Sequence, residues 1–311
     1  MKKVIIAMLI LGGAFQASGQ QEAMFTHYSF NTLGVNPGYA GSRNALTVTG
    51  LHRSQWVSFP GAPTTQTLTL HAPVFNEKVG LGLSFINDKI GPTTNTGIFA
   101  DFAYKIQVGD EGKLAFGLKA GLNVRGDDLT GLTIIDDNDP SFQANIQSQL
   151  MPNFGFGLYY SLPRFYAGIS TPRLLQNTIE ISNAPGAASL AAEARHYYVI
   201  AGTIFDLTEN GNVKLKPTTF LKVTAGAPIE LDITALFYFK DMLWAGPMLR
   251  TGDAVGVLAG VNLTDQFSLG YSFDWSFANS TGRYNAGSHE LMLRYDFIFN
   301  NKAKIESPRY F

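Results

Sequence analysis

Apolar and polar residues alternate one for one in segment after segment of this chain, and no other feature limits its fold as strongly. In 267–275 every second residue is apolar, and the residues between them are polar or glycine. The pattern recurs at 98–107, 113–124, 231–240 and 291–299. Because successive side chains of a strand point to opposite faces, this period of two predicts β-strands with one apolar face.

Strands of this kind extend over the chain from residue 45 to residue 299, about fourteen in number. We place them at 45–58, 64–73, 79–88, 96–108, 113–124, 152–161, 163–171, 195–206, 213–223, 229–239, 242–250, 254–263, 266–275 and 287–299. Two of them alternate poorly, and Pro217 and Pro247 each lack the N–H that a strand ladder needs. Bulges or contacts inside a barrel would explain these strands, and counts of about twelve or sixteen are the alternatives.

A soluble β-sandwich also alternates, so the choice of fold depends on charge and on the connections. The apolar faces carry almost no charge, whereas Lys and Asp recur on the opposite faces. Every second connection is short, and the longest ones, 125–151, 172–194 and 276–286, fall between the short ones. Outer-membrane barrels have this rhythm of periplasmic turns and external loops. We therefore predict an all-β fold, a transmembrane outer-membrane β-barrel of about 14 antiparallel strands with both chain ends on the periplasmic side.

The first residues resemble an export signal. Lys2 and Lys3 precede an apolar run at 4–15, and small residues at 17–19 provide a cleavage site. A membrane anchor is the alternative, but the run is shorter than the roughly 20 residues that a spanning helix needs. The predicted organisation is a signal peptide (1–19), an N-terminal periplasmic or plug segment (20–44), the barrel (45–299) and a periplasmic tail (300–311).

Composition excludes several function classes. The chain has no Cys, which excludes disulfides, thiol nucleophiles and Cys-ligated zinc. Its net charge falls from −1 to about −3 once Lys2 and Lys3 are removed, so no basic face for nucleic acid is expected.

Motifs for catalysis or metal binding are also missing from the sequence. No histidine has a second histidine at i+4, and there is no Gly-x-Ser-x-Gly elbow. The acidic run 136–139 could supply oxygen ligands for Ca²⁺, but it lacks the Gly and distal Glu of an EF-hand, and a solvated loop is the preferred interpretation. We expect no enzymatic activity and no cofactor.

Polar faces of the predicted strands carry charges of both signs. They include Asp101, Lys105, Lys119, Lys214, Lys216, Lys222, Asp232, Arg294 and Asp296. A selective pore usually favours one sign, so we expect a hydrated or internally paired interior. Glycines at alternate positions, as in 80–82 and 155–157, predict close packing against the inner wall.

The stretch 25–66 joins turn residues to large aromatic side chains. We interpret it as a lead-in that plugs the barrel or docks partners, followed by the first hairpin, with Arg43 or Arg53 pairing to a carboxylate in the lumen. The candidate docking or plug residues are Phe25, Tyr28, Asn36, Pro37, Tyr39, Gly41, Arg43, Arg53, Gln55, Trp56, Gly61 and Pro63. The alternative is that these residues only shape the entry to the first hairpin.

The same stretch resembles the PorP/SprF family. The resemblance rests on Phe25–Tyr28, Asn36–Arg43, Arg53–Val57 and Gly61–Thr67, and it continues through Val79–Gly82, Asn87–Pro92, Phe116–Gly121 and Ser307–Phe311. Gly38 stands where Ala would be more typical.

This resemblance implies an outer-membrane accessory protein of type IX secretion and gliding motility in Bacteroidetes, which acts by binding rather than catalysis. The implied partners are the outer-membrane lipid, an exported surface protein with a C-terminal sorting domain, and periplasmic components of the machinery. The predicted external loops 125–151 and 172–194 would be the platform for an exported partner. The main alternative is an outer-membrane transporter or porin for small solutes.

Overall fold

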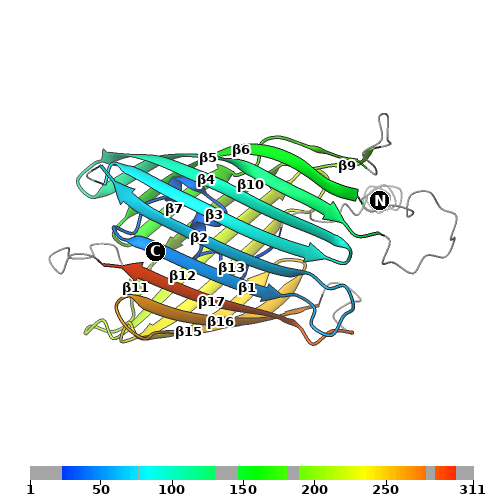
Figure 1. Ribbon diagram of the computed structural model, residues 1–311. Coiled ribbons are helices and arrows are strands. Elements are labelled where there is room, and N and C mark those ends of the chain that lie inside the picture. Colours follow the sequence, from blue (N-terminus) through cyan, green and yellow to red (C-terminus); the bar gives the residue numbers. More distant parts are fainter. Residues whose placement is uncertain (1–22, 76, 130–145, 181–188, 278–283, 299–311) are drawn as a thin grey trace, which may run out of the picture.

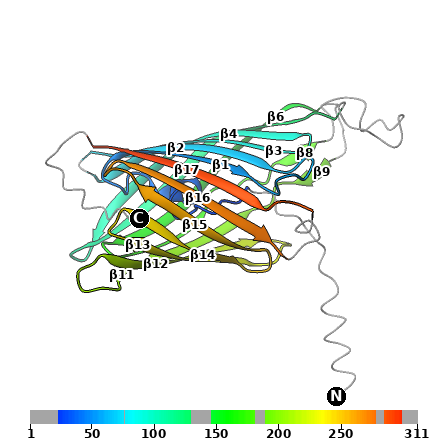
Figure 2. The ribbon, with the colours of Figure 1, turned by 90° about the horizontal axis from the view of Figure 1, so that it is seen from below.

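The computed structural model describes residues 23–75, 77–129, 146–180, 189–277 and 284–298, which form a closed antiparallel β-barrel (Figure 1). The strands tilt around one long axis, as the two perpendicular views show (Figures 1 and 2). β1 (Leu46–Ser54) pairs with β17 (Ser288–Phe297), and this pairing joins the first and last strands of the wall. The wall has fourteen strands, so the predicted fold and strand number are confirmed.

The wall strands follow one another along the chain with one interruption. Between β1 and β17 they are β2 (Thr64–Val74), β3 (Val79–Ile90), β4 (Thr93–Val108), β5 (Gly112–Asp127), β6 (Ile146–Leu162), β7 (Phe165–Thr171), β10 (His196–Thr203), β12 (Val213–Thr224), β13 (Glu230–Phe239), β14 (Leu243–Arg250), β15 (Ala254–Asn262) and β16 (Phe267–Ser276). β8 (Thr178–Glu180) and β9 (Ser189–Ala192) form a separate hairpin between β7 and β10. β11 (Phe205–Asp206) continues the edge of β10 against β12.

Two short 3-10 turns, η1 (Thr32–Gly34) and η2 (Pro37–Tyr39), precede the first strand. In the described part of the chain, no helix is long and apolar enough to cross a membrane.

The first strand is shorter than the sequence predicts. β1 ends at Ser54 and not at Ser58, because Trp56 and Ser58 have φ angles of 48° and 74°, which a strand does not allow. The N–H of Gln55 donates to the carbonyl of Pro63 at 2.9 Å and closes the connection. The next hairpin is longer than predicted: β3 extends to Ile90 instead of residue 88, and β4 begins at Thr93 instead of residue 96.

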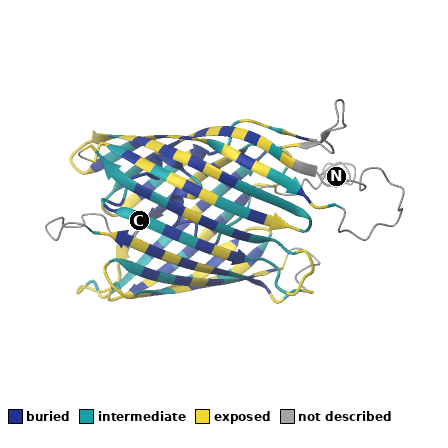
Figure 3. Ribbon diagram, in the orientation of Figure 1, coloured by how far each residue is buried: buried dark blue, intermediate teal, exposed yellow. Residues whose placement is uncertain are grey.

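Burial alternates along the wall strands, which gives the chequered pattern of Figure 3. Outward side chains are large and apolar, and Leu118, Ile98 and Val257 are each more than half exposed. Inward positions carry buried polar groups such as Asp101 and Lys119. A surface of this kind faces lipid, with the polar face turned to the lumen.

The two rims of the barrel differ. One rim, called here the short-turn rim, holds the connections that follow β2, β4, β6, β13 and β15, together with the start of β1 and the end of β17 (left in Figure 1). The other, called the long-loop rim, holds the long connections that follow β5, β7 and β16. By the usual rule for such barrels, the long-loop rim faces the cell exterior.

Charge placed on the lipid-facing surface tests this orientation of the strands. We expect Leu118→Arg, in the middle of β5, to cost about 2–4 kcal/mol of unfolding free energy because the bilayer midplane does not solvate the guanidinium. Leu150→Arg, near the long-loop end of β6, should cost about 0–1 kcal/mol. Urea unfolding in lipid vesicles measures both, and equal costs would contradict the assigned depth.

Candidate functional site in the barrel lumen

Residues 25–43, called here the lumen segment, lie inside the barrel (the dark blue chain within the wall in Figures 1 and 2). Most of their side chains are buried, including the polar ones. The segment has no long helix or strand because Pro and Gly interrupt it, and local side-chain bonds shape it instead. The Asn36 side chain accepts from the N–H of Gly38 at 2.9 Å and caps η2, with Pro37 at the first position of the turn.

Wall glycines let the lumen segment approach the strands. An added Cβ at Gly80 or Gly117 would come within 3.0 Å of the backbone of Ala40 or Gly38. At Gly157 and Gly168 an added Cβ would meet the Asn36 side chain at the same short range. The Asn36 amide also donates to the carbonyl of Leu158 in β6 at 2.9 Å. The predicted close packing at the inward glycines is thus confirmed, and the Asn-Pro-Gly turn is the part of the segment that uses it.

Aromatic side chains of the segment pack against aromatic residues of the wall. Tyr28 stacks on Phe220 with ring centroids 5.0 Å apart, and Phe30 stacks on Trp244 at 4.6 Å. The Tyr28 hydroxyl bonds to the hydroxyls of Thr218 in β12 and Thr234 in β13, at 3.0 and 3.3 Å, so its polar group is paired inside the lumen.

These contacts explain the two strands that alternate poorly. Tyr198 in β10 and Trp244 in β14 are large but point inward, because the lumen segment supplies their apolar surroundings. Of the two explanations raised by the sequence, contacts inside the barrel apply here. Strand pairing between β12 and β13 continues through Pro217, whereas the pairing between β13 and β14 is interrupted at Gly246 and Pro247.

Near the short-turn rim, Arg43 fastens the end of the segment to β17. Its guanidinium donates to both carboxylate oxygens of Asp296, at 2.8 and 3.3 Å, and Thr47 donates to the same carboxylate at 2.6 Å. Burial disfavours the charged form of Arg43, and the ion pair with Asp296 compensates for this cost. Close by, the Gly41 N–H donates to His71 and its carbonyl accepts from Lys105.

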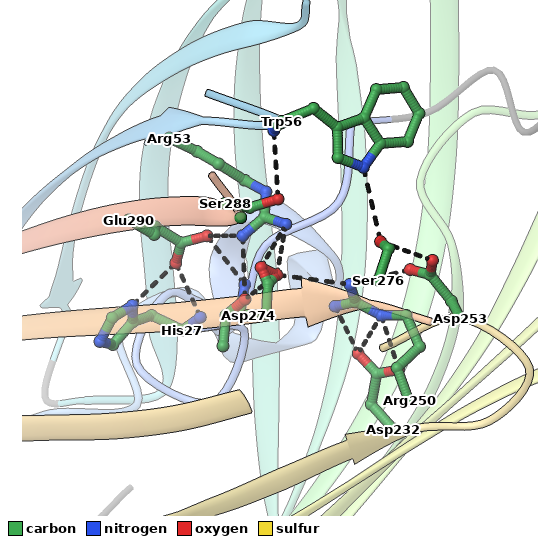
Figure 4. A network of polar contacts seen from close by, with 12 residues as sticks. His27, Arg53, Trp56, Asp232, Arg250, Asp253, Asp274, Ser276, Ser288 and Glu290 are labelled. Atoms are coloured by element: carbon green, nitrogen blue, oxygen red, sulfur yellow. Dashed lines mark hydrogen bonds and ion pairs between the residues drawn. The ribbon is translucent and has the colours of Figure 1, made fainter. Parts of the chain in front are cut away.

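Near the long-loop rim, a second set of polar contacts holds the start of the segment (Figure 4). The backbone N–H groups of Thr26 and His27 donate to the two carboxylate oxygens of Glu290, each at 2.8 Å. The His27 ring bonds to Glu290 through Nδ1 at 2.8 Å. Arg53 binds Asp274 with two hydrogen bonds of 2.6 and 2.9 Å, and it reaches Glu290 at 3.3 Å.

The same polar network continues along the inner face of the wall to Arg250 at the end of β14 (Figure 4). The guanidinium bonds to Asp232 at 2.9 Å and lies 3.9 Å from Asp274, which links it to Arg53. Glu230 and Asp253 lie within 3.6 Å of the same guanidinium. Because these groups are removed from water, each needs an opposite charge or a hydrogen bond to remain ionised.

The twelve candidate residues fall into two groups. Seven of them lie in the lumen segment: Phe25, Tyr28, Asn36, Pro37, Tyr39, Gly41 and Arg43. Arg53 joins them from β1, so both predicted pairings, of Arg43 and of Arg53, are present. The other four belong to the first connection on the long-loop rim, where Gln55 and Pro63 bond to each other, Trp56 donates to Ser276, and the carbonyl of Gly61 accepts from Gly91.

Several members of the polar network are not predicted from the sequence. Glu290 and Arg250 were not among the lumen-facing candidates, although Asp274 was placed on a polar face. Arg250 ends a strand that alternates poorly, which hid its orientation. Among the predicted lumen charges, Lys119 pairs with Asp101 at 2.8 Å, Asp232 with Arg250 at 2.9 Å and Asp296 with Arg43 at 2.8 Å, so internal pairing is confirmed for these charges.

No metal site emerges from the part of the chain that the structure describes, since no three His, Asp or Glu side chains there are grouped as ligands. The acidic run 136–139 lies outside the described residues. The described contacts in the lumen are ion pairs, backbone caps and aromatic contacts, which hold the lumen segment against the wall.

Comparison with solved structures places this fold among outer-membrane barrels. The CymD monoaromatic hydrocarbon channel is similar over 90% of this chain and 95% of its own, with 9% identity and a TM-score of 0.50. The Omp33 outer membrane protein of Acinetobacter baumannii is similar over 82% of this chain and 100% of its own, with 8% identity and a TM-score of 0.48. At such identities the likeness concerns the fold alone. No curated protein matches the sequence.

The molecule is an outer-membrane β-barrel whose lumen holds its own residues 25–43. The family model for the type IX secretion system membrane protein PorP/SprF matches residues 17–295, and the chain belongs to this family.

Removing one charge from the network should be costly. We expect Arg53→Met to lower the unfolding free energy by about 3–5 kcal/mol, because Asp274 and Glu290 stay buried without their shared cation. Lys113→Met is the control, since its pair with Glu77 is largely exposed and worth below about 1 kcal/mol. Urea titration in vesicles compares them, and similar small losses would show that the network does not stabilise the barrel.

Glycine contacts give a second test of the lumen segment. Gly117→Ala should cost about 1–3 kcal/mol, because the new methyl overlaps the backbone of the segment. Gly50→Ala, on the outward face of β1, is the matched control: its Cβ has only one neighbour, at 3.9 Å, so stability should hold or rise. The same titration measures both, and equal effects would mean that the segment does not rest on Gly117.

Proposed function

We propose that this protein is an accessory component of the type IX secretion machinery, which supports the export or surface anchoring of a particular exported protein. It acts by binding partners and not by catalysis. We further propose that the exported partner carries a C-terminal sorting domain, that the periplasmic contacts are with secretion or motility components, and that gliding is one process it serves.

The observation that carries this proposal is the occupied lumen of a barrel that belongs to a secretion family. The lumen segment contacts the wall from one rim to the other, and its His27 and Arg43 bond to Glu290 and Asp296 of the wall. A lumen built in this way favours a binding protein over an open solute pore. Recognition then falls to the rims, because loops on a rigid scaffold carry most binding functions.

The long-loop rim is the proposed platform for the exported partner. It carries the connection between β7 and β10, which includes the β8–β9 hairpin. Within that connection Asn177 donates to Glu193 at 2.8 Å, and Arg195 donates to the carbonyl of Leu174 at 2.9 Å, so its base is ordered by its own contacts. The short-turn rim is the proposed side for periplasmic partners.

Quantitative mass spectrometry of the surface and secreted proteins tests the proposal. Deletion of the gene should remove one or a few large surface proteins and leave the others unchanged. A strain in which residues 178–192 are replaced by a short Gly-Ser linker should lose the same proteins while the barrel still assembles, which heat-modifiable migration on a gel can verify. An unchanged surface proteome together with a defect in nutrient uptake would overturn the proposal and favour a small-solute transporter.

A further inference from the structure

Contacts along β17 give the direction in which the lumen segment crosses the barrel. β17 begins at Ser288 on the long-loop rim and ends at Phe297 on the short-turn rim. Thr26 and His27 bond to Glu290 near its beginning, whereas Arg43 bonds to Asp296 near its end. At about 3.4 Å per strand residue, these two carboxylates are about 20 Å apart along the strand. The segment therefore descends from the long-loop rim to the short-turn rim.

Contacts with other strands also place the start of the lumen segment toward the long-loop rim. Arg53, which donates to the hydroxyl of Thr26 at 3.0 Å, is the next-to-last residue of β1 on the long-loop side. Ala23 and Phe25 line one pocket together with Pro172 and Arg173, which follow β7 on its long-loop side, and this pocket reaches inward to Lys119 in the middle of β5.

Contacts of Gly41 place the end of the lumen segment near the short-turn rim. The backbone of Gly41 lies against Gly80, near the start of β3, and its carbonyl accepts from Lys105, near the end of β4. Both strand ends belong to the short-turn rim. Between the two ends, the chain at 36–40 rests against the wall glycines, so the segment passes once through the lumen.

We propose that the chain enters the barrel through the long-loop rim, so that Ala23 is reachable from the cell exterior. This differs from the expectation that the lead-in segment lies on the periplasmic side. The start of the lumen segment then belongs to the same face as the long connections, and a macromolecule that covers this face from outside meets both. The inference rests on the contacts of the segment and does not depend on the secretion role.

Single cysteines provide the test, because the chain has none of its own. Ala23→Cys is compared with Ala225→Cys, an exposed position in the β12–β13 turn on the long-loop rim, and with Asp110→Cys, an exposed position in the β4–β5 turn on the short-turn rim. Intact cells are treated with a maleimide on a polyethylene glycol chain too large for outer-membrane porins. Parallel samples are treated after the outer membrane has been opened, and others after unfolding in detergent.

We expect Ala23→Cys to be labelled in intact cells together with Ala225→Cys, while Asp110→Cys reacts only after the membrane is opened. Labelling of Ala23→Cys only in opened cells, like Asp110→Cys, would overturn the proposal. A thiol that reacts only after unfolding would also overturn it, because the proposal requires access from outside. Met24→Cys replaces Ala23→Cys if that variant does not assemble, as judged by heat-modifiable migration.

Discussion

A barrel of fourteen strands encloses more space than its own inward side chains fill, and this chain fills the space with a stretch of itself. About eight strands give an interior that side chains can just fill, and larger barrels leave a channel or hold a plug. Here the inserted chain has to pass close to the wall as backbone, which requires wall residues without a Cβ. Gly80 and Gly117 meet that requirement against the backbone of Ala40 and Gly38, and Gly157 leaves room for the Asn36 side chain.

Charge is the second condition that the filled lumen imposes. Asp274, Glu290 and Asp296 have lost much of their contact with water, and ionised carboxylates in that state are stable only beside cations or hydrogen-bond donors. The lumen segment provides Arg43 and the N–H groups of Thr26 and His27, and β1 provides Arg53. Glu290 and Asp296 of the wall thus find donors in the segment, whereas Asp274 is paired within the wall.

Strand positions could be predicted from the sequence because lipid and lumen impose opposite polarities on alternate residues. That rule is local, so it located β16 and β17 within a few residues. It weakened at Tyr198 and Trp244, where the lumen contains aromatic rings instead of water. The partners of Arg53 could not be predicted, since Asp274 lies 221 residues away and only barrel closure brings the two together. For the same reason Arg250 and Glu290 remained unrecognised, while the turn at 36–39 was identified from its own residues.

Because the lumen is filled, similarity of fold to a channel does not indicate that this barrel transports solutes. The same barrel architecture carries solutes in some proteins and not in others, because function belongs to the site and not to the fold. In this chain the two rims are the proposed surfaces for recognition, and their connections differ in length. The lumen segment joins them physically, since it is fastened at Glu290 near one rim and at Asp296 near the other. A partner that displaced the segment at the long-loop rim would first have to break the contacts of Thr26 and His27, whereas the glycine contacts at 36–40 would still hold the rest. The first half of the segment is therefore the part of the lumen that binding from outside could change.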